Sequence, residues 1–257
     1  KKHQILKKYC EKKKLIFMST PFSYEAAKLL NSLKIKLFKI GSGECNNLPL
    51  IEKVSKFNKP LIISTGMNSL KDIEKTYKHA KKNNSKIILM HCVSIYPTPA
   101  SKTMLETIPL LKKKFNCPVG FSDHSYGIAN SLYHISRGAL YIEKHFTLDK
   151  KMEGPDHILS MLPEEFSNMR ERVRIVEKSL GDGIKQPSSS EVASVIRFRK
   201  TMYAKNDIKK GTVINENDII YTAPAYGIYA KYEDIVFGKI ANRDISKNTP
   251  ITWDLIS

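Results

Sequence analysis

The sequence predicts an α/β fold, a TIM-type (β/α)8 barrel of which about six βα units are present, followed by a small β-rich domain. Between residues 14 and 147, short apolar strands alternate with amphipathic helical stretches, which is the pattern of repeated βα units around a parallel sheet. Polar or small residues follow each strand, as they do where a barrel carries its active site at the carboxyl ends of its strands. Beyond residue 180 a turn-rich run ends the alternation and indicates a change of domain.

The candidate strands are short apolar segments. They are residues 15–18, 37–40, 61–64, 87–90, 118–121 and 140–143. Because a closed barrel of this type has eight strands, the order predicts that the absent units precede Lys1 and that the barrel is incomplete at its N-terminus. An open doubly wound sheet is the structural alternative.

Helix start signals lie between the strands. Ser23 and Ser69 each precede an amphipathic stretch, where a serine side chain can accept a hydrogen bond from the first helical turn. A longer helix is predicted from Pro163, because proline suits the first turn and the two following glutamates face the positive end of the helix dipole. Its predicted core positions are Phe166, Met169, Val173, Val176 and Leu180.

The composition of residues 181–190 is that of a linker, and it divides the chain into domains. We expect a partial, catalytic barrel over residues 1–182, a linker over 183–196 and a small domain over 197–257. Within the small domain, residues 207–214 are echoed by residues 244–251. This echo predicts a pseudo-symmetric arrangement of turns and short strands.

Charge and composition limit the function classes. The net charge of +18 is spread over short groups of lysines along the chain, and it does not form one basic tract interleaved with aromatic residues, so nucleic-acid binding is disfavoured. No apolar run approaches the roughly 20 residues of a membrane span, and the lysine-rich start has no signal-peptide core, so we expect a cytoplasmic protein without a membrane partner. The four cysteines are widely spaced, which indicates reduced thiols and neither disulfides nor a zinc site.

The predicted strand ends present a cup of polar side chains. Its members are Ser19, Thr20, Lys39, Ser42, Glu44, Ser64, Thr65, Ser94, Tyr96, Ser122, His124 and His145. Hydroxyls and a lysine that converge with backbone amides suit a phosphate or a carboxylate, because these donors match anionic oxygens. Two histidines at adjacent strand ends can share one divalent ion.

Simpler roles compete with these. Lys39 lies inside an apolar strand, where burying its charge without a partner is costly; an anionic ligand would satisfy it, and so would a neighbouring carboxylate such as Glu143. For His91 and His134 we prefer a structural, hydrogen-bonded role.

Several motifs resemble the sialic acid synthase family, over nearly the whole chain. They are Lys39-Ile40-Gly41-Ser42-Gly43-Glu44-Cys45-Asn46-Asn47, Ser64-Thr65-Gly66-Met67, Tyr96-Pro97-Thr98-Pro99, Phe121-Ser122-Asp123-His124-Ser125 and Gly154-Pro155-Asp156-His157. The resemblance implies a (β/α)8 barrel followed by an antifreeze-like (SAF) domain. It also implies condensation of phosphoenolpyruvate with an N-acetylated hexosamine such as N-acetylmannosamine, giving a nine-carbon sugar acid and phosphate.

The resemblance carries roles onto matching residues. His124 and His145 would bind a divalent metal, Mn²⁺ or Mg²⁺. Phosphoenolpyruvate would be held by Thr20, Lys39, Ser42, Ser64, Ser94 and Ser122. Glu44 would lie beside the reacting carbons, and Tyr96 and Asp156 would contact the sugar. The segment 43–47 is more similar to the sialic and legionaminic acid synthases than to the pseudaminic branch.

Two departures from the family shape our expectations. The family's first two barrel strands have no counterpart, so we expect this polypeptide alone neither to close the barrel nor to turn over efficiently. Where bacterial relatives have Lys-Arg-Pro-Gly, this chain has residues 222–225, Thr-Ala-Pro-Ala, which lack the sugar-binding arginine. For the complete protein we expect a homodimer in which each SAF domain caps the barrel of the other subunit. A basic binding module for nucleic acid or polysaccharide, with a non-catalytic barrel fragment, is the alternative function.

Overall fold

The computed structural model describes residues 2–84 and 86–257. Within it the chain divides into two compact units, Lys1–Asp182 and Gly183–Ser257. Each unit has its own cluster of buried apolar side chains, so each is described by itself.

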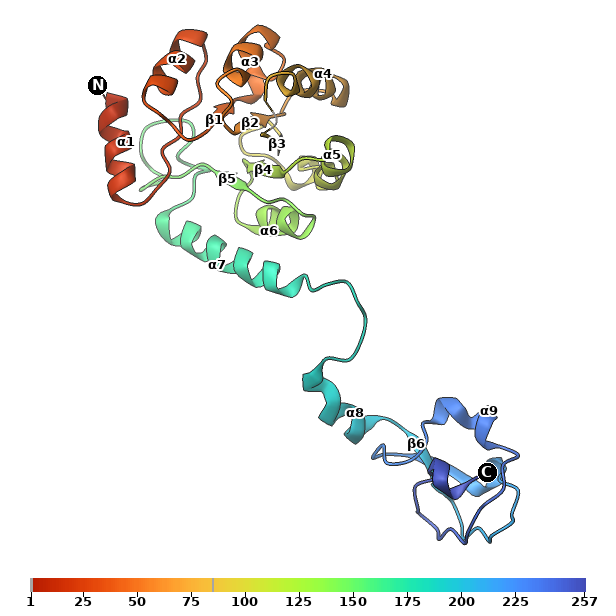
Figure 1. The fold of residues 1–257 in the computed structure, drawn as a ribbon. Coiled ribbons are helices and arrows are strands. Elements are labelled where there is room, and N and C mark those ends of the chain that lie inside the picture. The colour runs from red at the N-terminus through yellow and green to blue at the C-terminus, as the bar shows by residue number, and fades with distance from the viewer. Residues whose placement is uncertain (1, 85) are drawn as a thin grey trace. The chain divides into compact units, whose positions relative to one another are not determined.

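A parallel five-stranded sheet forms the centre of the first unit (Figure 1). Its strands are β1 (Phe38–Ile40), β2 (Leu61–Ser64), β3 (Ile87–Cys92), β4 (Val119–Asp123) and β5 (Ile142–Lys144). Each strand pairs with the next one along the chain, in the order β1-β2-β3-β4-β5. A doubly wound sheet reverses its strand order at one point, and this sheet does not, so the arrangement is that of a half-barrel.

Helices alternate with these strands and cover the outside of the sheet (Figure 1). They are α1 (Lys2–Lys12), α2 (Tyr24–Ser32), α3 (Leu48–Ser55), α4 (Leu70–Lys81), α5 (Thr107–Phe115), α6 (Ala129–Ser136) and α7 (Pro163–Ser179), with short 3-10 turns η1 (Ser42–Glu44) and η2 (Ala100–Lys102). The predicted caps are confirmed, since the hydroxyl of Ser23 accepts from the backbone N–H of Ala26 and Ser69 forms a capping box with Asp72.

The strand predicted at residues 15–18 is wrong. Residues 15–20 have no regular structure, and Leu15 and Ile16 are 63% and 60% exposed. Only Phe17 of the apolar run packs against the core. A strand is stabilised by the hydrogen bonds of its ladder, and within the described chain the N–H of Leu15 instead bonds to the carbonyl of Cys10, which closes the end of α1.

The core pattern predicted for α7 is partly wrong. Met169 is buried, and Val173 and Val176 pack against the core, whereas Phe166 and Leu180 are 39% and 51% exposed. The helix therefore presents a narrower apolar stripe than its sequence suggests, and it packs mainly against α6.

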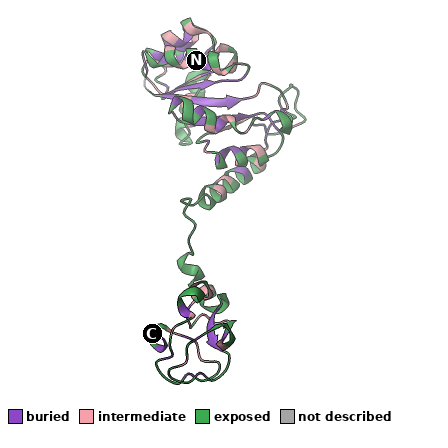
Figure 2. Ribbon diagram, turned by 90° about the vertical axis from the view of Figure 1, so that its right-hand side faces the viewer, coloured by how far each residue is buried: buried purple, intermediate pink, exposed green. Residues whose placement is uncertain are grey.

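The core lies between the strands and the helices that flank them. All four residues of β2 are buried, as are Phe38 of the neighbouring β1 and Phe121 of β4. The strands of the first unit are coloured mostly as buried (Figure 2). The four cysteines are free thiols, as predicted. Within the described residues no helix is long and apolar enough to span a membrane.

The second unit consists of short strands and turns. Its elements are η3 (Ser189–Glu191), α8 (Val192–Phe198), β6 (Thr201–Ala204), η4 (Glu216–Asp218), β7 (Ile219–Thr222), η5 (Ala230–Tyr232), α9 (Glu233–Val236) and η6 (Trp253–Leu255). Helix α8 begins within the stretch that we expected to be a linker, and residues 181–188 before it have no regular structure.

The echoed segments of the second unit lie against each other, which the sequence analysis did not predict. Ile208 and Ile245 form an antiparallel bridge in which each N–H donates to the other carbonyl at 2.8 Å. The carboxylate of Asp244 accepts from the backbone N–H of Lys210 at 2.8 Å, and the carboxylate of Asp207 accepts from the backbone N–H of Lys247 at 2.7 Å. Each repeat thus caps the turn of the other, which explains why the aspartates recur at equivalent positions.

Candidate active site

A cluster of hydroxyls lies just beyond β1 and β2. The Ser42 hydroxyl donates to the Ser64 hydroxyl at 2.9 Å and accepts from the backbone N–H of Gly66 at 3.1 Å. The Ser94 hydroxyl also lies close to Gly66: an ideal Cβ built on this glycine would be 2.4 Å from the Ser94 hydroxyl oxygen. Three serines from successive strand ends therefore surround a backbone N–H, which is a donor set suited to an anionic oxygen.

The lysine of this site is paired with a carboxylate. Lys39 Nζ lies 3.2 Å from Glu143 Oε1, and the Lys39 side chain is only 14% exposed. The same carboxylate oxygen accepts from the Ser122 hydroxyl at 2.7 Å. The second of the two partners that the sequence allowed for Lys39 is therefore the one observed, and it places a cation and an anion side by side on the floor of the cup.

Three aromatic rings meet above this floor. The ring centroids of His124 and His145 are 5.3 Å apart and nearly perpendicular. Tyr96 lies against both, at 4.0 Å from His124 and 5.6 Å from His145. The carboxylate of Asp156 lies 3.5 Å from Nδ1 of His145. The predicted histidines are thus neighbours, with the tyrosine and the aspartate on the same side of the cup.

Hydrogen bonds fix the orientation of His124. Its Nδ1 donates to the carbonyl of Val93 at 2.9 Å, so Nε2 carries the lone pair, and Nε2 lies 3.5 Å from the Ser122 hydroxyl. Burial lowers the pKa of His124, but its contacts with Cys92 and the Val93 carbonyl more than offset burial and hold the pKa above its usual value. For His145, burial and the neighbouring His124 lower the pKa.

A thiol that the sequence analysis did not single out completes the cluster. Cys92 Sγ lies 3.9 Å from Nδ1 of His124 and 3.9 Å from the Ser94 hydroxyl. Burial raises the pKa of Cys92, but interactions with His124, Ser42 and Ser64 outweigh it and lower the pKa to about 7. Only its place at the end of β3, two residues before Ser94, could have indicated it in the sequence.

The donor set is compatible with a divalent ion. In the part of the chain that the structure describes, no group of three or more His, Cys, Asp or Glu side chains is gathered as a closed metal site. The candidate metal ligands are therefore the imidazoles of His124 and His145. Because Nδ1 of His124 donates to the Val93 carbonyl, Nε2 of this ring keeps its lone pair for a metal. An ion held by His124 and His145 would therefore keep open positions for water and substrate oxygens.

The structure brings most of the predicted residues together but leaves two apart. Lys39, Ser42, Ser64, Ser94, Tyr96, Ser122, His124, His145 and Asp156 form one connected set, through the contacts above. Glu44 lies in the same short turn as Ser42, yet its carboxylate accepts from the side-chain amide of Asn47 at 2.6 Å. Thr20 approaches the backbone at Gly41, where an added Cβ would lie 3.7 Å from its methyl group.

His91 and His134 lie outside the cup, as we expected. His91 Nε2 donates to the carbonyl of Thr103 at 2.8 Å. His134 Nδ1 donates to the carbonyl of Asn130 at 2.7 Å, and its ring stacks on Phe121 with centroids 3.4 Å apart. Both imidazoles serve the packing behind the sheet.

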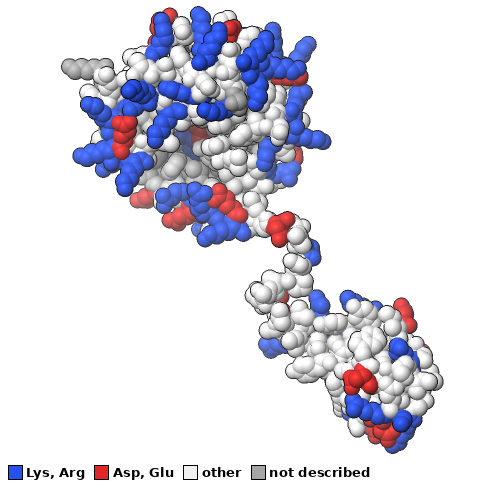
Figure 3. All heavy atoms as spheres, viewed as in Figure 1, with Lys and Arg blue, Asp and Glu red and all other residues white. Residues whose placement is uncertain are grey.

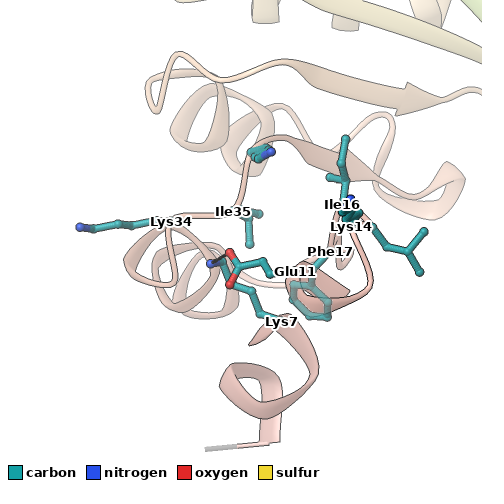
Figure 4. A pocket seen from close by; sticks show the side chains of 9 residues that line it. Lys7, Glu11, Lys14, Ile16, Phe17, Lys34 and Ile35 are labelled. Atoms are coloured by element: carbon teal, nitrogen blue, oxygen red, sulfur yellow. Dashed lines mark hydrogen bonds and ion pairs between the residues drawn. The ribbon is translucent and has the colours of Figure 1, made fainter. Parts of the chain in front are cut away.

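The other cavities and charged side chains of the first unit offer fewer groups that could catalyse a reaction. A cavity of about 320 Å³ lies between α1 and residues 34–36 (Figure 4). Of the charges that line it, Lys7 and Glu11 form an ion pair with each other, and Lys34 extends away from it. Lysine and arginine side chains are scattered over the visible face of the first unit (Figure 3). A second cavity, of about 600 Å³, adjoins the cup at Ser94 and has mostly apolar walls from α4 and α5.

The chain is similar in sequence and fold to known proteins. Residues 1–185 match the NeuB family and residues 199–257 match the SAF domain. The chain is 43% identical to the N,N'-diacetyllegionaminic acid synthase of Campylobacter jejuni, over 96% of this chain and 75% of the relative. It is 35% identical to the pseudaminic acid synthase of the same species, over 90% of this chain and 67% of the relative.

A solved structure agrees with the half-barrel. The N-acetylneuraminic acid (sialic acid) synthetase of Leptospira borgpetersenii, solved in complex with citrate, matches with a TM-score of 0.71 and 34% identity, over 75% of this chain and 67% of that one. The match over residues 1–185 and the identities to these relatives confirm the family suggested by the strand-end motifs, and the chain belongs to the NeuB family.

Proposed function

We propose that this chain provides the phosphoenolpyruvate and metal sites of a nonulosonate synthase. The enzyme would condense phosphoenolpyruvate with an N-acetylated hexosamine, such as N-acetylmannosamine, and release inorganic phosphate. The observation that carries the proposal is the arrangement at the strand ends, where serine hydroxyls gathered around a backbone N–H, a half-buried lysine and two adjacent imidazoles belong to one connected set. The activities for which these relatives are named support the same reaction class.

The anion-binding group would hold phosphoenolpyruvate. Lys39 supplies a positive charge, and Thr20, Ser42, Ser64, Ser94 and Ser122 would supply hydroxyl donors. Because Lys39 is already paired with Glu143 at 3.2 Å, the substrate anion would share this lysine and would not meet an isolated cation. A fixed lysine and fixed hydroxyls stabilise anionic oxygens without having to reorient during the reaction.

The carbon–carbon bond forms when the methylene carbon of phosphoenolpyruvate attacks the aldehyde carbon of the sugar. A divalent ion on His124 and His145, Mn²⁺ or Mg²⁺, would withdraw electrons from the aldehyde oxygen as a Lewis acid. The attack leaves positive charge at the former enol carbon, water adds there, and the tetrahedral intermediate expels phosphate. A carboxylate near that carbon lowers the barrier electrostatically, and Glu44, oriented by Asn47, is our candidate for this role and for placing the water.

The sugar would lie on the side of the cup formed by Tyr96 and Asp156, which flank the two histidines. The higher identity to the legionaminic than to the pseudaminic synthase of one species supports a sugar of the sialic or legionaminic type. A homodimer with exchanged SAF domains and a cytoplasmic location stay predictions.

The direct test is phosphate release from phosphoenolpyruvate by the full-length protein. The assay would use a panel of N-acetylated hexosamines, with Mn²⁺ and with a chelator. We expect release that depends on both metal and sugar, and loss of the metal-dependent rate in His124→Ala and in His145→Ala. His79→Ala is the matched control, because this half-buried histidine of α4 pairs with Glu52 away from the cup.

Two results would contradict the proposal. Retained metal-dependent activity in both histidine variants would remove the metal assignment. No phosphate release with any sugar, together with binding to random oligonucleotides that weakens steeply with salt, would favour the basic binding module instead.

A further inference from the structure

A buried ion pair lies directly behind the two histidines. Asp123 and Lys144 are cross-strand partners in the β4–β5 register, with Nζ 3.2 Å from Oδ2, and their side chains are 0% and 1% exposed. Each immediately precedes one of the histidines in the chain, His124 and His145. Because side chains alternate along a strand, this pair points away from Ser122 and Glu143, the cup residues just before it, and Asp123 reaches Ser131 of α6.

Hydrogen bonds satisfy both charges of the pair. Asp123 Oδ1 accepts from the backbone N–H of Ser125 at 2.8 Å and from its hydroxyl at 2.6 Å, and Oδ2 accepts from the hydroxyl of Ser131 in α6 at 2.6 Å. Lys144 Nζ donates to the carbonyl of Ser125 at 2.6 Å and to that of Gly127 at 3.2 Å. One network therefore joins the ends of β4 and β5, the loop after His124, and α6.

Fold stability alone does not explain such a pair. Removing two charges from water is costly, and apolar side chains of similar size often serve a protein core as well or better. The geometric effect of the network is more specific, because it fixes the backbone at 123–125 relative to the backbone at 144. That relation sets the distance between the Cα atoms of the two histidines that follow these positions.

Metal binding is sensitive to this distance. Ligand atoms must lie within about 0.2 Å of their proper positions, and groups behind the ligands commonly set that geometry. We propose that Asp123 and Lys144 are positioning residues, which hold His124 and His145 at the separation required to share one divalent ion. This inference rests on the metal site of the proposed function, and neither residue touches the substrate or the ion.

The experiment compares the Mn²⁺ affinity of folded variants of the full-length protein in the absence of substrate, by calorimetry and by electron paramagnetic resonance. Asp123→Asn keeps the shape of the side chain and removes its charge, and we expect Mn²⁺ to bind about 10- to 100-fold more weakly. Ile51→Val, a change in the fully buried core of α3, is the control for general destabilisation and should leave the affinity within about two-fold.

A double-mutant cycle tests whether the two charges act as one device. Lys144→Met and the double variant with Asp123→Asn should lose about as much Mn²⁺ affinity as either single variant, because the second change removes nothing further. Multiplicative losses in the double variant, or wild-type affinity in a folded Asp123→Asn protein, would overturn the proposal. If Asp123→Asn does not fold, Ser131→Ala removes only one hydrogen bond to the carboxylate; weaker Mn²⁺ binding in that variant supports the proposal, and unchanged binding overturns it.

A second readout separates this inference from the proposed function. The imidazole nitrogen signals of His124 and His145 can be followed by nuclear magnetic resonance without metal, and we expect both to shift in Asp123→Asn but not in Ile51→Val. If the wild-type protein binds no Mn²⁺, the proposed metal site fails, and these signals still decide whether the pair positions the histidines. Unchanged signals in Asp123→Asn would overturn the positioning role.

Discussion

A methyl group added at Gly66 would enter the part of the cup where we propose that phosphoenolpyruvate binds. An ideal Cβ at this position lies 2.4 Å from the Ser94 hydroxyl, 2.9 Å from the Ser42 hydroxyl and 3.1 Å from the Cys92 sulfur. Ordinary contact begins at 3.4 Å, so the Ser94 hydroxyl must move by about 3.4 − 2.4 = 1.0 Å. The backbone of Gly66 has no positive φ, so alanine would act through these contacts alone.

The expected loss follows from that displacement. A misplacement of about 1 Å in a group that orients a substrate costs on the order of 10²-fold in rate. Overpacking of this kind also costs about 1–3 kcal/mol of stability. We therefore expect kcat/KM for phosphoenolpyruvate to fall about 100-fold in Gly66→Ala, with a modest decrease in the free energy of unfolding.

Gly43→Ala is the matched control, because its added Cβ would meet nothing within 4 Å although it lies beside Ser42 and Glu44 in the same turn. Both variants should be assayed for phosphate release over a range of phosphoenolpyruvate concentrations, with circular dichroism to show that they are folded. If folded Gly66→Ala and Gly43→Ala have the same kcat/KM, the cup does not hold the phosphate or carboxylate of the substrate.

Further predictions concern the lysine of the cup, the buried histidine behind the sheet and the second unit. Lys39→Met should weaken phosphoenolpyruvate binding about 10- to 100-fold in calorimetry, since a charge-assisted hydrogen bond is worth roughly 1.5–3 kcal/mol; unchanged affinity would exclude contact between Lys39 and the substrate. Burial lowers the pKa of His134 to about 4, so its stabilising contribution is complete above the unfolded-state pKa of about 6.5 and is lost as the pH falls towards 4. By pH 5 this loss amounts to about 2 kcal/mol. The free energy of urea unfolding of the first unit should therefore fall less between pH 7.5 and pH 5 in His134→Leu than in the wild-type protein; an equal fall in both would show that the lowered pKa of His134 does not cause the loss. Asp244→Ala should lower the unfolding midpoint of the second unit, because it removes the acceptor for the Lys210 N–H. The fluorescence of Trp253, the single tryptophan, reports this midpoint. An unchanged midpoint would contradict the mutual capping of the echoed segments.

The sheet was largely predictable because its strands are short apolar runs between turn signals. The segment 61–64 coincides with β2, and the other predicted strands of the sheet differ from the observed ones by one or two residues at their ends. The prediction at 15–18 failed because an apolar run indicates burial or strand propensity but not whether a neighbour completes the ladder. Helix α1 was not predicted, because its sequence is dominated by lysines, and the structure buries none of its residues.

The polar cup was predictable because parallel strands bring their carboxyl ends to one edge. The partners within it were less accessible, since pairing depends on the register between strands far apart in the sequence. For Lys39 the sequence allowed an anionic ligand or a carboxylate such as Glu143 without deciding between them, and the structure joins Lys39 and Glu143, 104 residues apart, at 3.2 Å. Asp123 and Lys144 escaped notice for a further reason, because each stands beside a more conspicuous histidine and points away from the cup residue just before it.

The most direct test of the account is a crystal structure of the full-length protein with Mn²⁺ and phosphoenolpyruvate, using anomalous scattering to locate the metal. We expect one manganese peak about 2.0–2.3 Å from Nε2 of both His124 and His145, with the phosphoenolpyruvate oxygens on Lys39, Ser42 and Ser64. A manganese peak away from these two histidines, or phosphoenolpyruvate bound outside the strand-end cup, would contradict it.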